Sequence, residues 1–265
     1  SNYKSPQWLM KENSNKDKFS NYSFEFDGVS DEISLGSLEI NTDAAWSVSF
    51  WANLTSYHTA FPGVFTLKTN ESQGFCCFFS QNGSYKGINF GANTAPFVNI
   101  KTDGDISASL VGAWNNIILA YNGNGKTTLS NYTIFVNGAA VTAVNPGSFG
   151  TVTNQSILGK LSQNYQGKID EFAVYNTELT STNASFIYNG GVPNDISSLS
   201  PIAHYRMGEE ATFSSSWTIP DQVGSNDGTS ANMTIEDRVG DAPNSSSNAV
   251  SFNMTESDRE TDVPT

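Results

Sequence analysis

Residues 46–51 read WSVSFW, and this short stretch decides the fold class of the chain. Trp46, Val48 and Phe50 alternate with serine, so every second side chain is large and apolar. Successive side chains of a β-strand point to opposite faces, and a period of two is typical of a strand with one face in a core. We therefore expect a strand that buries its Trp46 face and leaves the other face outside the core.

Outward from this stretch, short apolar runs end at glycine, asparagine or serine about every ten residues, as expected for strands joined by turns. Asn137 and Gly138 are the strongest hairpin signal, because a two-residue hairpin turn needs residues that tolerate positive φ. Only residues 180–188 read as a helix, with Thr180 as its cap and Asn189 at its end. The expected strands are 22–26, 33–35, 46–51, 64–67, 74–80, 87–91, 114–121, 132–136, 139–144, 156–158 and 167–175.

These elements predict an all-β protein, namely a two-sheet antiparallel jelly-roll sandwich. The 265 residues suffice for one such domain with appendages. We expect an N-terminal arm at residues 1–20, the sandwich at 21–194, and a C-terminal extension at 195–265 with few strands and an acidic tail. The credible strands of the extension are 202–207 and 250–252.

Composition excludes several classes of function. The chain has 26 Asp and Glu against 13 Lys and Arg, a net charge of −13, and no basic cluster that could follow a phosphate backbone, so nucleic acid is not an expected partner. No apolar run of about 18 residues occurs, so membrane insertion is not expected. The only cysteines, Cys76 and Cys77, are adjacent and cannot join distant strands, so the fold depends on its core.

Several of these segments together resemble the laminin-G-like branch of the concanavalin A-like lectin/glucanase superfamily. They are Phe26-Asp27-Gly28 with Asp31 and Ile33, and residues 46–51, 114–121, 135–138, 167–172 and 187–191. The resemblance covers roughly residues 22–191 and implies a concanavalin A-like jelly roll. It further implies a structural calcium ion in many members and a ligand surface on loops or on one face.

A second resemblance concerns residues 204–209, HYRMGE, followed by Asp221, Gly224 and Gly228. This segment is similar to the ending of structural proteins of marine bacteriophages. The resemblance implies a virion protein, and the scarcity of cysteine agrees with folding in a reducing cytoplasm.

Two aspartates are the expected calcium ligands. Asp27 lies at a turn beside Gly28, and Asp170 lies in the GKIDEF segment at 167–172. Calcium needs six to eight oxygen ligands, many of them carboxylates near sharp turns, and the resemblance implies that these two strands approach each other. The alternative is that Asp27 only caps its turn, while Asp170 is held by backbone amides or by Lys168.

A glycan or a partner protein would be recognised by exposed aromatic side chains, which stack on sugar rings beside polar groups that bind hydroxyls. The candidates in expected loops are Tyr57, His58, Phe61, Tyr85 and Tyr165. The tryptophans 46, 51 and 114 lie inside strand patterns and are expected in the core.

An enzyme is not expected. Residues 256–260, ESDRE, have the carboxylate spacing of some glycosidases, but no apolar pattern surrounds them to desolvate a catalytic acid. His58 and His204 are the only histidines, no Gly-x-Ser-x-Gly elbow accompanies them, and His204 is expected to be structural.

Three functions remain open at this point. The first is a non-enzymatic virion structural or recognition protein, such as a decoration, fibre or tail-associated module, that binds a glycan or a neighbouring subunit. The second is an extracellular carbohydrate-binding domain of a bacterial or eukaryotic protein, for which Asn-x-Ser/Thr sequons such as Asn82 would carry sugar. The third is a glycan-degrading enzyme. The arm and the extension would also suit a homo-oligomer held by extended segments.

Overall fold

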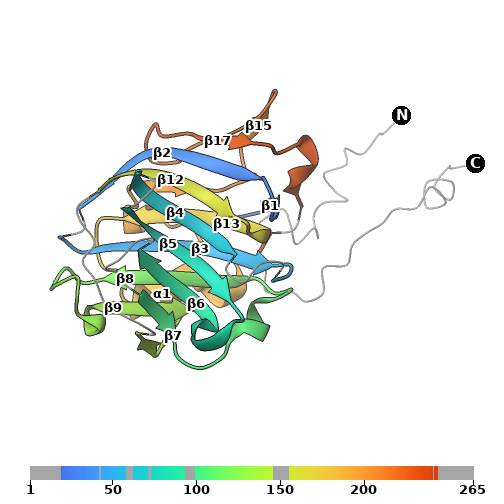
Figure 1. Cartoon of the computed structure of the whole chain (residues 1–265). Helices are drawn as coiled ribbons and strands as arrows, with labels where there is room; N and C mark the ends of the chain where they lie inside the picture. The colour runs from blue at the N-terminus through green and yellow to red at the C-terminus, as the bar shows by residue number, and fades with distance from the viewer. Residues whose placement is uncertain are drawn as a thin grey trace, which may run out of the picture.

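The computed structural model describes residues 19–41, 43–57, 62–70, 73–92, 99–145, 155–240 and 242–243. In these ranges two antiparallel sheets pack face to face, and one short α-helix lies outside them (Figure 1). The predicted all-β, two-sheet sandwich of the concanavalin A-like type is therefore confirmed.

The first sheet has eight strands, and its centre is β3, the strand that contains residues 46–51. In spatial order its strands are β10 (Ala139–Val141), β9 (Tyr132–Val136), β8 (Asn115–Tyr121), β3 (Trp46–Leu54), β13 (Gln166–Tyr175), β1 (Ser23–Asp27) and β18 (Arg238–Val239), with β14 (Ala203–Tyr205) also paired to β13.

The second sheet has ten strands and covers the inner face of the first. In spatial order its strands are β11 (Ala143–Val144), β7 (Asn99–Thr102), β6 (Gly87–Ala92), β5 (Gln73–Ser80), β4 (Gly63–Asn70), β12 (Gln155–Gln163), β2 (Glu32–Ile40), β17 (Gly228–Ala231), β16 (Trp217–Ile219) and β15 (Thr212–Phe213).

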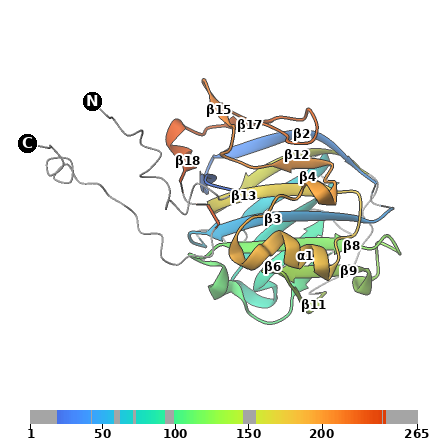
Figure 2. The same ribbon diagram turned by 180° about the vertical axis from the view of Figure 1, so that it is seen from behind.

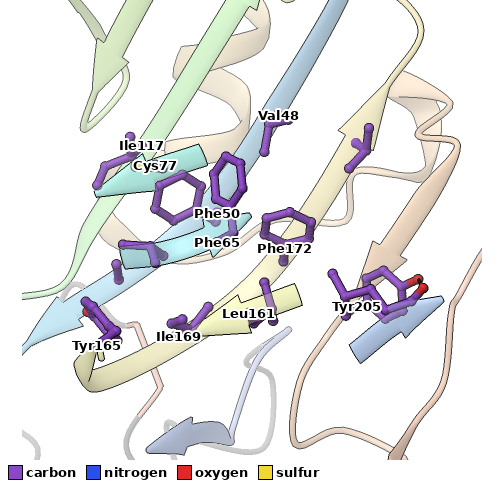
Figure 3. Packing of buried hydrophobic residues seen from close by; sticks show 14 of the residues in the cluster. Val48, Phe50, Phe65, Cys77, Ile117, Leu161, Tyr165, Ile169, Phe172 and Tyr205 are labelled. Atoms are coloured by element: carbon purple, nitrogen blue, oxygen red, sulfur yellow. Dashed lines mark hydrogen bonds between the residues drawn. The ribbon is translucent and has the colours of Figure 1, made fainter. Parts of the chain in front are cut away.

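The core between the sheets follows from the alternation of apolar residues. Val48 and Phe50 of β3 point inward, as predicted, and are fully buried. Phe65 of the second sheet lies between Phe50 and Phe172 of the first, with T-shaped ring contacts of 5.6 Å and 5.3 Å between centroids (Figure 3). Such aromatic pairs contribute about 0.5–1.5 kcal/mol beyond the area they bury, so this contact holds the two layers together.

The prediction that one face of β3 lies outside the core is wrong. Ser47, Ser49 and Trp51 are also buried, because helix α1 (Ser181–Tyr188) and the segment after it cover the outer face of the first sheet (Figure 2). Trp51 stacks on Tyr188 of this helix, with ring centroids 5.8 Å apart. The strand is therefore covered on both sides.

Local signals at turns and caps are confirmed. Asn137 and Gly138 both have positive φ, 52° and 77°, and the hairpin of β9 and β10 closes around them. The strand expected at 139–144 is divided in two: β10 pairs with β9 in the first sheet, whereas Ala143 and Val144 form β11, which pairs with β7 in the other sheet. Thr180 caps α1 with a capping box, as predicted.

The C-terminal segment is a larger part of the sandwich than its composition suggests. The strand expected at 202–207 is β14, and strands β15, β16 and β17 extend the second sheet beyond β2, while β18 pairs with β1 in the first. The strand expected at 250–252 and the acidic tail lie outside the described residues.

Cys76 and Cys77 are thiols that lie on opposite faces of β5. Cys77 is buried in the core, whereas the Cys76 thiol donates to the Gly91 carbonyl, 3.1 Å away. Among the described residues, no helix is long and apolar enough to span a membrane.

Candidate functional site

Three carboxylates form an acidic cluster where β13 meets the turn after β14. Asp170 and Glu171 belong to β13, and Glu209 lies in the turn that follows β14. Each side chain offers an oxygen, and these three oxygens lie within 4.8 Å of one another. We call Asp170, Glu171 and Glu209 the acidic cluster. In the part of the chain that the structure describes, it is the one group of three such residues that could hold a metal ion.

A bulge in β13 brings two consecutive carboxylates to the same site. On a regular strand Asp170 and Glu171 would point to opposite faces. The register with β3 shifts between Asp170 and Ala173, and Glu171 has a positive φ of 46°. Such a bulge re-aims side chains, and left-handed backbone at a residue other than glycine persists only where the surroundings hold it.

Glu209 is held in a similarly unusual backbone. The residues on either side of the Gly208–Glu209 pair, Met207 and Glu210, have positive φ values of 47° and 60°. Gly208 leaves room for the neighbouring chain, because a Cβ atom there would lie 2.3 Å from Cβ of Tyr22. Backbone strain in both segments that carry the cluster is typical of a site under functional constraint.

Two basic side chains engage Glu171. His204 Nε2 lies 2.6 Å from Glu171 Oε2, and both side chains are almost fully buried. Arg206 Nε donates to Glu171 Oε1 over 3.4 Å. Glu171 is therefore bound by cationic or hydrogen-bonding partners at both oxygens, which leaves Asp170 and Glu209 as the less compensated carboxylates.

The chain just before β1 closes over the cluster. Ser20 Oγ donates to Asp170 Oδ2 over 2.6 Å, and the Tyr22 amide donates to Glu209 Oε1 over 3.1 Å. The Asn21 amide donates to the same Glu209 oxygen. Residues 20–22 thus link the carboxylates of β13 and of the turn after β14.

Burial makes the cluster electrostatically costly. Asp170 is 0% exposed and Glu171 is 4% exposed. Burial, with the charges of Glu171 and Glu209, raises the pKa of Asp170 well above its usual range. Burial also raises the pKa of Glu209, and its Oε2 atom is buried without a hydrogen-bond partner. A proton or a cation at the cluster would remove this cost.

The donor set fits the calcium ion that the family resemblance implies. Calcium binds carboxylate and other hard oxygen ligands at 2.3–2.6 Å, and each carboxylate oxygen can accept one hydrogen bond and still offer a lone pair. The unpartnered Oε2 of Glu209 is the observation that favours a cation over a closed hydrogen-bond network.

The predicted pairing of Asp27 with Asp170 does not form. Asp27 faces Gln166, four residues along β13 from Asp170, which is roughly 13 Å at the rise of a strand. Asp27 Oδ1 instead accepts from the amides of Val29 and Ser30, at 2.7 Å and 2.9 Å. It therefore caps its own turn, which was the alternative reading, and Glu209 is the carboxylate that approaches Asp170.

The predicted glycan-binding aromatics fall into three groups. Tyr57 and Tyr85 are half-buried; Tyr57 and Lys86, the residue after Tyr85, both contact the loop at residues 103–107. Tyr165 lies in the short connection between β12 and β13, as predicted, but it is 0% exposed and so is not the exposed aromatic side chain that a glycan site needs: it packs on Phe79 in the core, with ring centroids 6.0 Å apart. His58 and Phe61 lie outside the described residues.

Contacts around the loop connect Tyr57 with the segment of Tyr85. The Tyr57 hydroxyl donates to the Ser107 carbonyl over 3.0 Å. Asp105 accepts from Ser107 on one side and pairs with Lys86, 2.9 Å away, on the other. Burial and the charge of Asp105 raise the pKa of Tyr57 to about 12. We call Tyr57, Tyr85, Lys86 and Asp105 the tyrosine rim.

Sequence reasoning missed Glu209 and did not select Glu171 or His204 as site residues. Glu171 follows Asp170 directly, but the bulge that brings both side chains to one site has no local signal in the sequence. Glu209 was noted only within residues 204–209, and nothing in that segment indicates that it folds back onto β13.

Comparisons with solved structures agree with the fold. A candidate carbohydrate-binding protein from Bacteroides ovatus has a TM-score of 0.58 at 14% identity, and the match covers 84% of this chain and 61% of that one. Two weaker matches have TM-scores below 0.5. A heptameric pentraxin from Limulus polyphemus has a TM-score of 0.45 at 13% identity, and the match covers 63% of this chain and 82% of that one. Domain 4 of the arabinanase AbnA from Geobacillus stearothermophilus, in complex with arabinotriose, has a TM-score of 0.48 at 16% identity, and the match covers 62% of this chain and 74% of that one.

The family assignment rests on sequence. No curated protein matches the chain over its sequence. The family model of the Concanavalin A-like lectin/glucanases superfamily matches residues 27–185, which is more than half of the 265 residues. That range begins in β1 and ends within α1, so it takes in the central strands of both sheets. The chain therefore belongs to the concanavalin A-like lectin/glucanase superfamily.

Proposed function

We propose that this protein is a non-catalytic glycan-recognition module that holds a structural calcium ion and is displayed on a virion or another extracellular surface. The observation that carries the proposal is the family match over residues 27–185, because the superfamily description names lectins and glucanases. A choice between these two activities must come from the residues of the site.

The burial of the acidic cluster supports a lectin rather than a glucanase. The two carboxyl groups of a glycosidase flank the scissile bond and must reach it. Asp170 and Glu171 are 0% and 4% exposed, and Ser20, His204 and Arg206 occupy the space around their oxygens. A sugar would have no access to them. The glycosidase-like motif at 256–260 lies outside the described residues.

In this proposal Asp170, Glu171 and Glu209 hold the calcium ion. The ion would supply positive charge among two buried carboxylates and the partly buried Glu209, and no chemical step depends on it. Its effect would be to hold β13 to the turn after β14, because Asp170 and Glu171 lie on the first and Glu209 on the second. Calcium would therefore stabilise the contact between the sandwich and its C-terminal segment.

The tyrosine rim is the proposed glycan surface. Tyr85 follows three exposed residues, Asn82, Gly83 and Ser84, so a ligand could approach its ring from solvent. The Lys86 and Asp105 side chains beside it are about half exposed and offer donors and acceptors for sugar hydroxyls. An aromatic ring next to such charged groups is the usual combination at protein sites for sugars.

The first experiment is a glycan-array screen of the purified protein in calcium, followed by titration of the best glycan. Tyr85→Ala should weaken binding about tenfold, equivalent to about 1.4 kcal/mol. Phe186→Ala is the matched control, because Phe186 is a 38% exposed aromatic on α1, behind the other sheet. Equal affinities of Tyr85→Ala and the parent would place the glycan elsewhere. Binding to no glycan would leave the lectin proposal without support.

Native mass spectrometry of the protein taken from its source would distinguish the two proposed surroundings. A large homo-multimeric assembly whose Asn-x-Ser/Thr sites carry no sugar would support a virion role. A glycosylated monomer would support the extracellular carbohydrate-binding alternative. The same spectrum would report one bound calcium ion per chain or its absence.

A further inference from the structure

The segment Phe19, Ser20, Asn21 and Tyr22, which we call the strap, lies directly before β1 and crosses the acidic cluster. It reaches two carboxylates on different elements: Ser20 Oγ donates to Asp170, and the amides of Asn21 and Tyr22 donate to Glu209. The strap therefore closes only when Asp170 of β13 and Glu209 of the following turn are close together.

Two arginines, Arg206 and Arg238, make further contacts with the strap. The Arg206 guanidinium carbon lies 3.9 Å from the centre of the Phe19 ring, and Arg206 Nη2 donates to the Phe19 carbonyl. The Arg238 guanidinium lies 5.0 Å from the centre of the Tyr22 ring. Because Arg206 also donates to Glu171, one side chain connects the strap with the cluster.

We infer that closure of the strap and binding of a divalent cation at the acidic cluster form one coupled equilibrium, so that the cation determines whether residues 19–22 are held against the sandwich. The inference rests on the cation site of the proposed function. The inference adds a conformational role to that site, because the bound cation would hold residues 19–22 where they join the first strand.

The physical reason is repulsion between buried carboxylates. When Asp170 and Glu209 are both ionised and no cation lies between them, their repulsion favours separation of β13 from the turn that carries Glu209. Separation breaks the hydrogen bonds of Ser20 to one and of Asn21 and Tyr22 to the other. A divalent cation reverses the sign of the interaction and brings both acceptors to the positions that the strap needs.

Thermodynamic linkage makes the inference quantitative. If cation binding favours the closed strap by a given factor, then the cation must bind the closed strap more tightly than the open strap by the same factor, and a variant that opens the strap can weaken binding by up to that factor. Couplings of this kind commonly amount to 5–150-fold. A substitution that perturbs the strap without touching a carboxylate must therefore change calcium affinity as well as strap opening.

The test combines hydrogen exchange with calcium titration on the full chain. Exchange at the Asn21 and Tyr22 amides should slow about tenfold or more in calcium relative to chelator, because both amides donate to Glu209 only in the closed strap. Phe19→Ala removes the ring under Arg206 without touching a carboxylate. It should weaken calcium binding, measured by calorimetry, by the factor by which it speeds exchange at these amides in calcium, divided by the factor by which it speeds exchange in chelator.

Two glycine variants provide a second route and a control. Gly208→Ala would place a Cβ atom 2.3 Å from Cβ of Tyr22 and should open the strap, again with weaker calcium binding. Gly240→Ala has no heavy atom within 4 Å of the new Cβ and should change neither quantity.

The outcomes separate the two levels of the argument. Stoichiometric calcium binding with unchanged exchange at Asn21 and Tyr22 would overturn the strap inference and leave the cation site standing. Absence of calcium binding by the parent chain would overturn the cation site, and the inference with it. Unchanged affinity in an open-strap variant would also overturn the inference.

Discussion

Trp217 provides the sharpest test of whether the C-terminal segment belongs to the sandwich. It lies on β16 of the ten-stranded sheet and is 2% exposed, yet its ring contacts Phe24 of β1 in the other sheet, with centroids 5.1 Å apart. Its indole nitrogen donates to the Thr234 carbonyl over 2.7 Å, and Phe213 packs on the ring at 5.1 Å. Replacement by alanine removes all of these contacts.

The expected cost follows from the burial. A buried tryptophan removes about 150–250 Å² from water, which at about 25 cal/mol per Å² is worth about 4–6 kcal/mol, and measured losses for Trp→Ala in cores are about 3–5 kcal/mol. We take about 4 kcal/mol. For chains of this size each kcal/mol lowers Tm by about 2–4 °C, so Trp217→Ala should lower Tm by about 8–16 °C.

The assay is urea denaturation and calorimetry of the parent, Trp217→Ala and a control, Val223→Ala. Val223 lies in the same segment but is 51% exposed, so its replacement should change stability by less than about 0.5 kcal/mol. The reasoning predicts one cooperative transition with a lower midpoint and an unchanged m-value. A parent-like midpoint, or a separate early transition of the C-terminal segment alone, would refute it.

Three further predictions concern single groups. Burial, with the charges of Asp27 and Asp237, raises the pKa of Asp31 to about 6, so the folded chain keeps a proton there that the unfolded chain loses near pH 4. Stability should therefore fall as pH rises from about 4 to about 6, and Asp31→Asn should remove this slope from a plot of Tm against pH. Burial and the neighbouring Cys76 raise the pKa of the Cys77 thiol, so peptide mapping after alkylation of the native protein should find Cys77 unmodified; rapid modification would contradict its place in the core. Tyr165→Phe should leave glycan affinity in the array assay unchanged, and a tenfold loss would show that this side chain reaches the ligand.

The parts of the fold that could be predicted from sequence are those that depend on neighbouring residues. Alternation at Trp46, Val48 and Phe50 predicts β3. The Asn137-Gly138 pair predicts the hairpin of β9 and β10, and Thr180 predicts the start of α1. Each signal acts within a few residues, because side-chain direction, positive φ and capping are local properties.

The candidate site depends on contacts between distant residues, and sequence reasoning found only part of it. Asp170 was selected, but its partner was expected at Asp27 because the resemblance implies that the two strands approach each other; β1 and β13 do pair, but their register places Asp27 opposite Gln166. Tyr165 was predicted in a loop and does lie in the connection between β12 and β13, but its burial was not predicted. Asn164, with φ of 57°, turns the chain so that the tyrosine ring points into the core.

The late position of β17 and β18 in the chain has a consequence for the solubility of shortened proteins. β17 pairs with Glu32, Ile33 and Ser34 of β2, and β18 pairs with β1, so neither of these early strands lies at a sheet edge. A chain cut after residue 194 would keep the pairing of β1 with β13 and of β2 with β12, but it would leave unpaired the amide and carbonyl groups that face β18 and β17. Exposed edges of this kind act as templates for pairing with other chains. Fragments trimmed to the region matched by the family model should therefore self-associate, even though they retain most of the core.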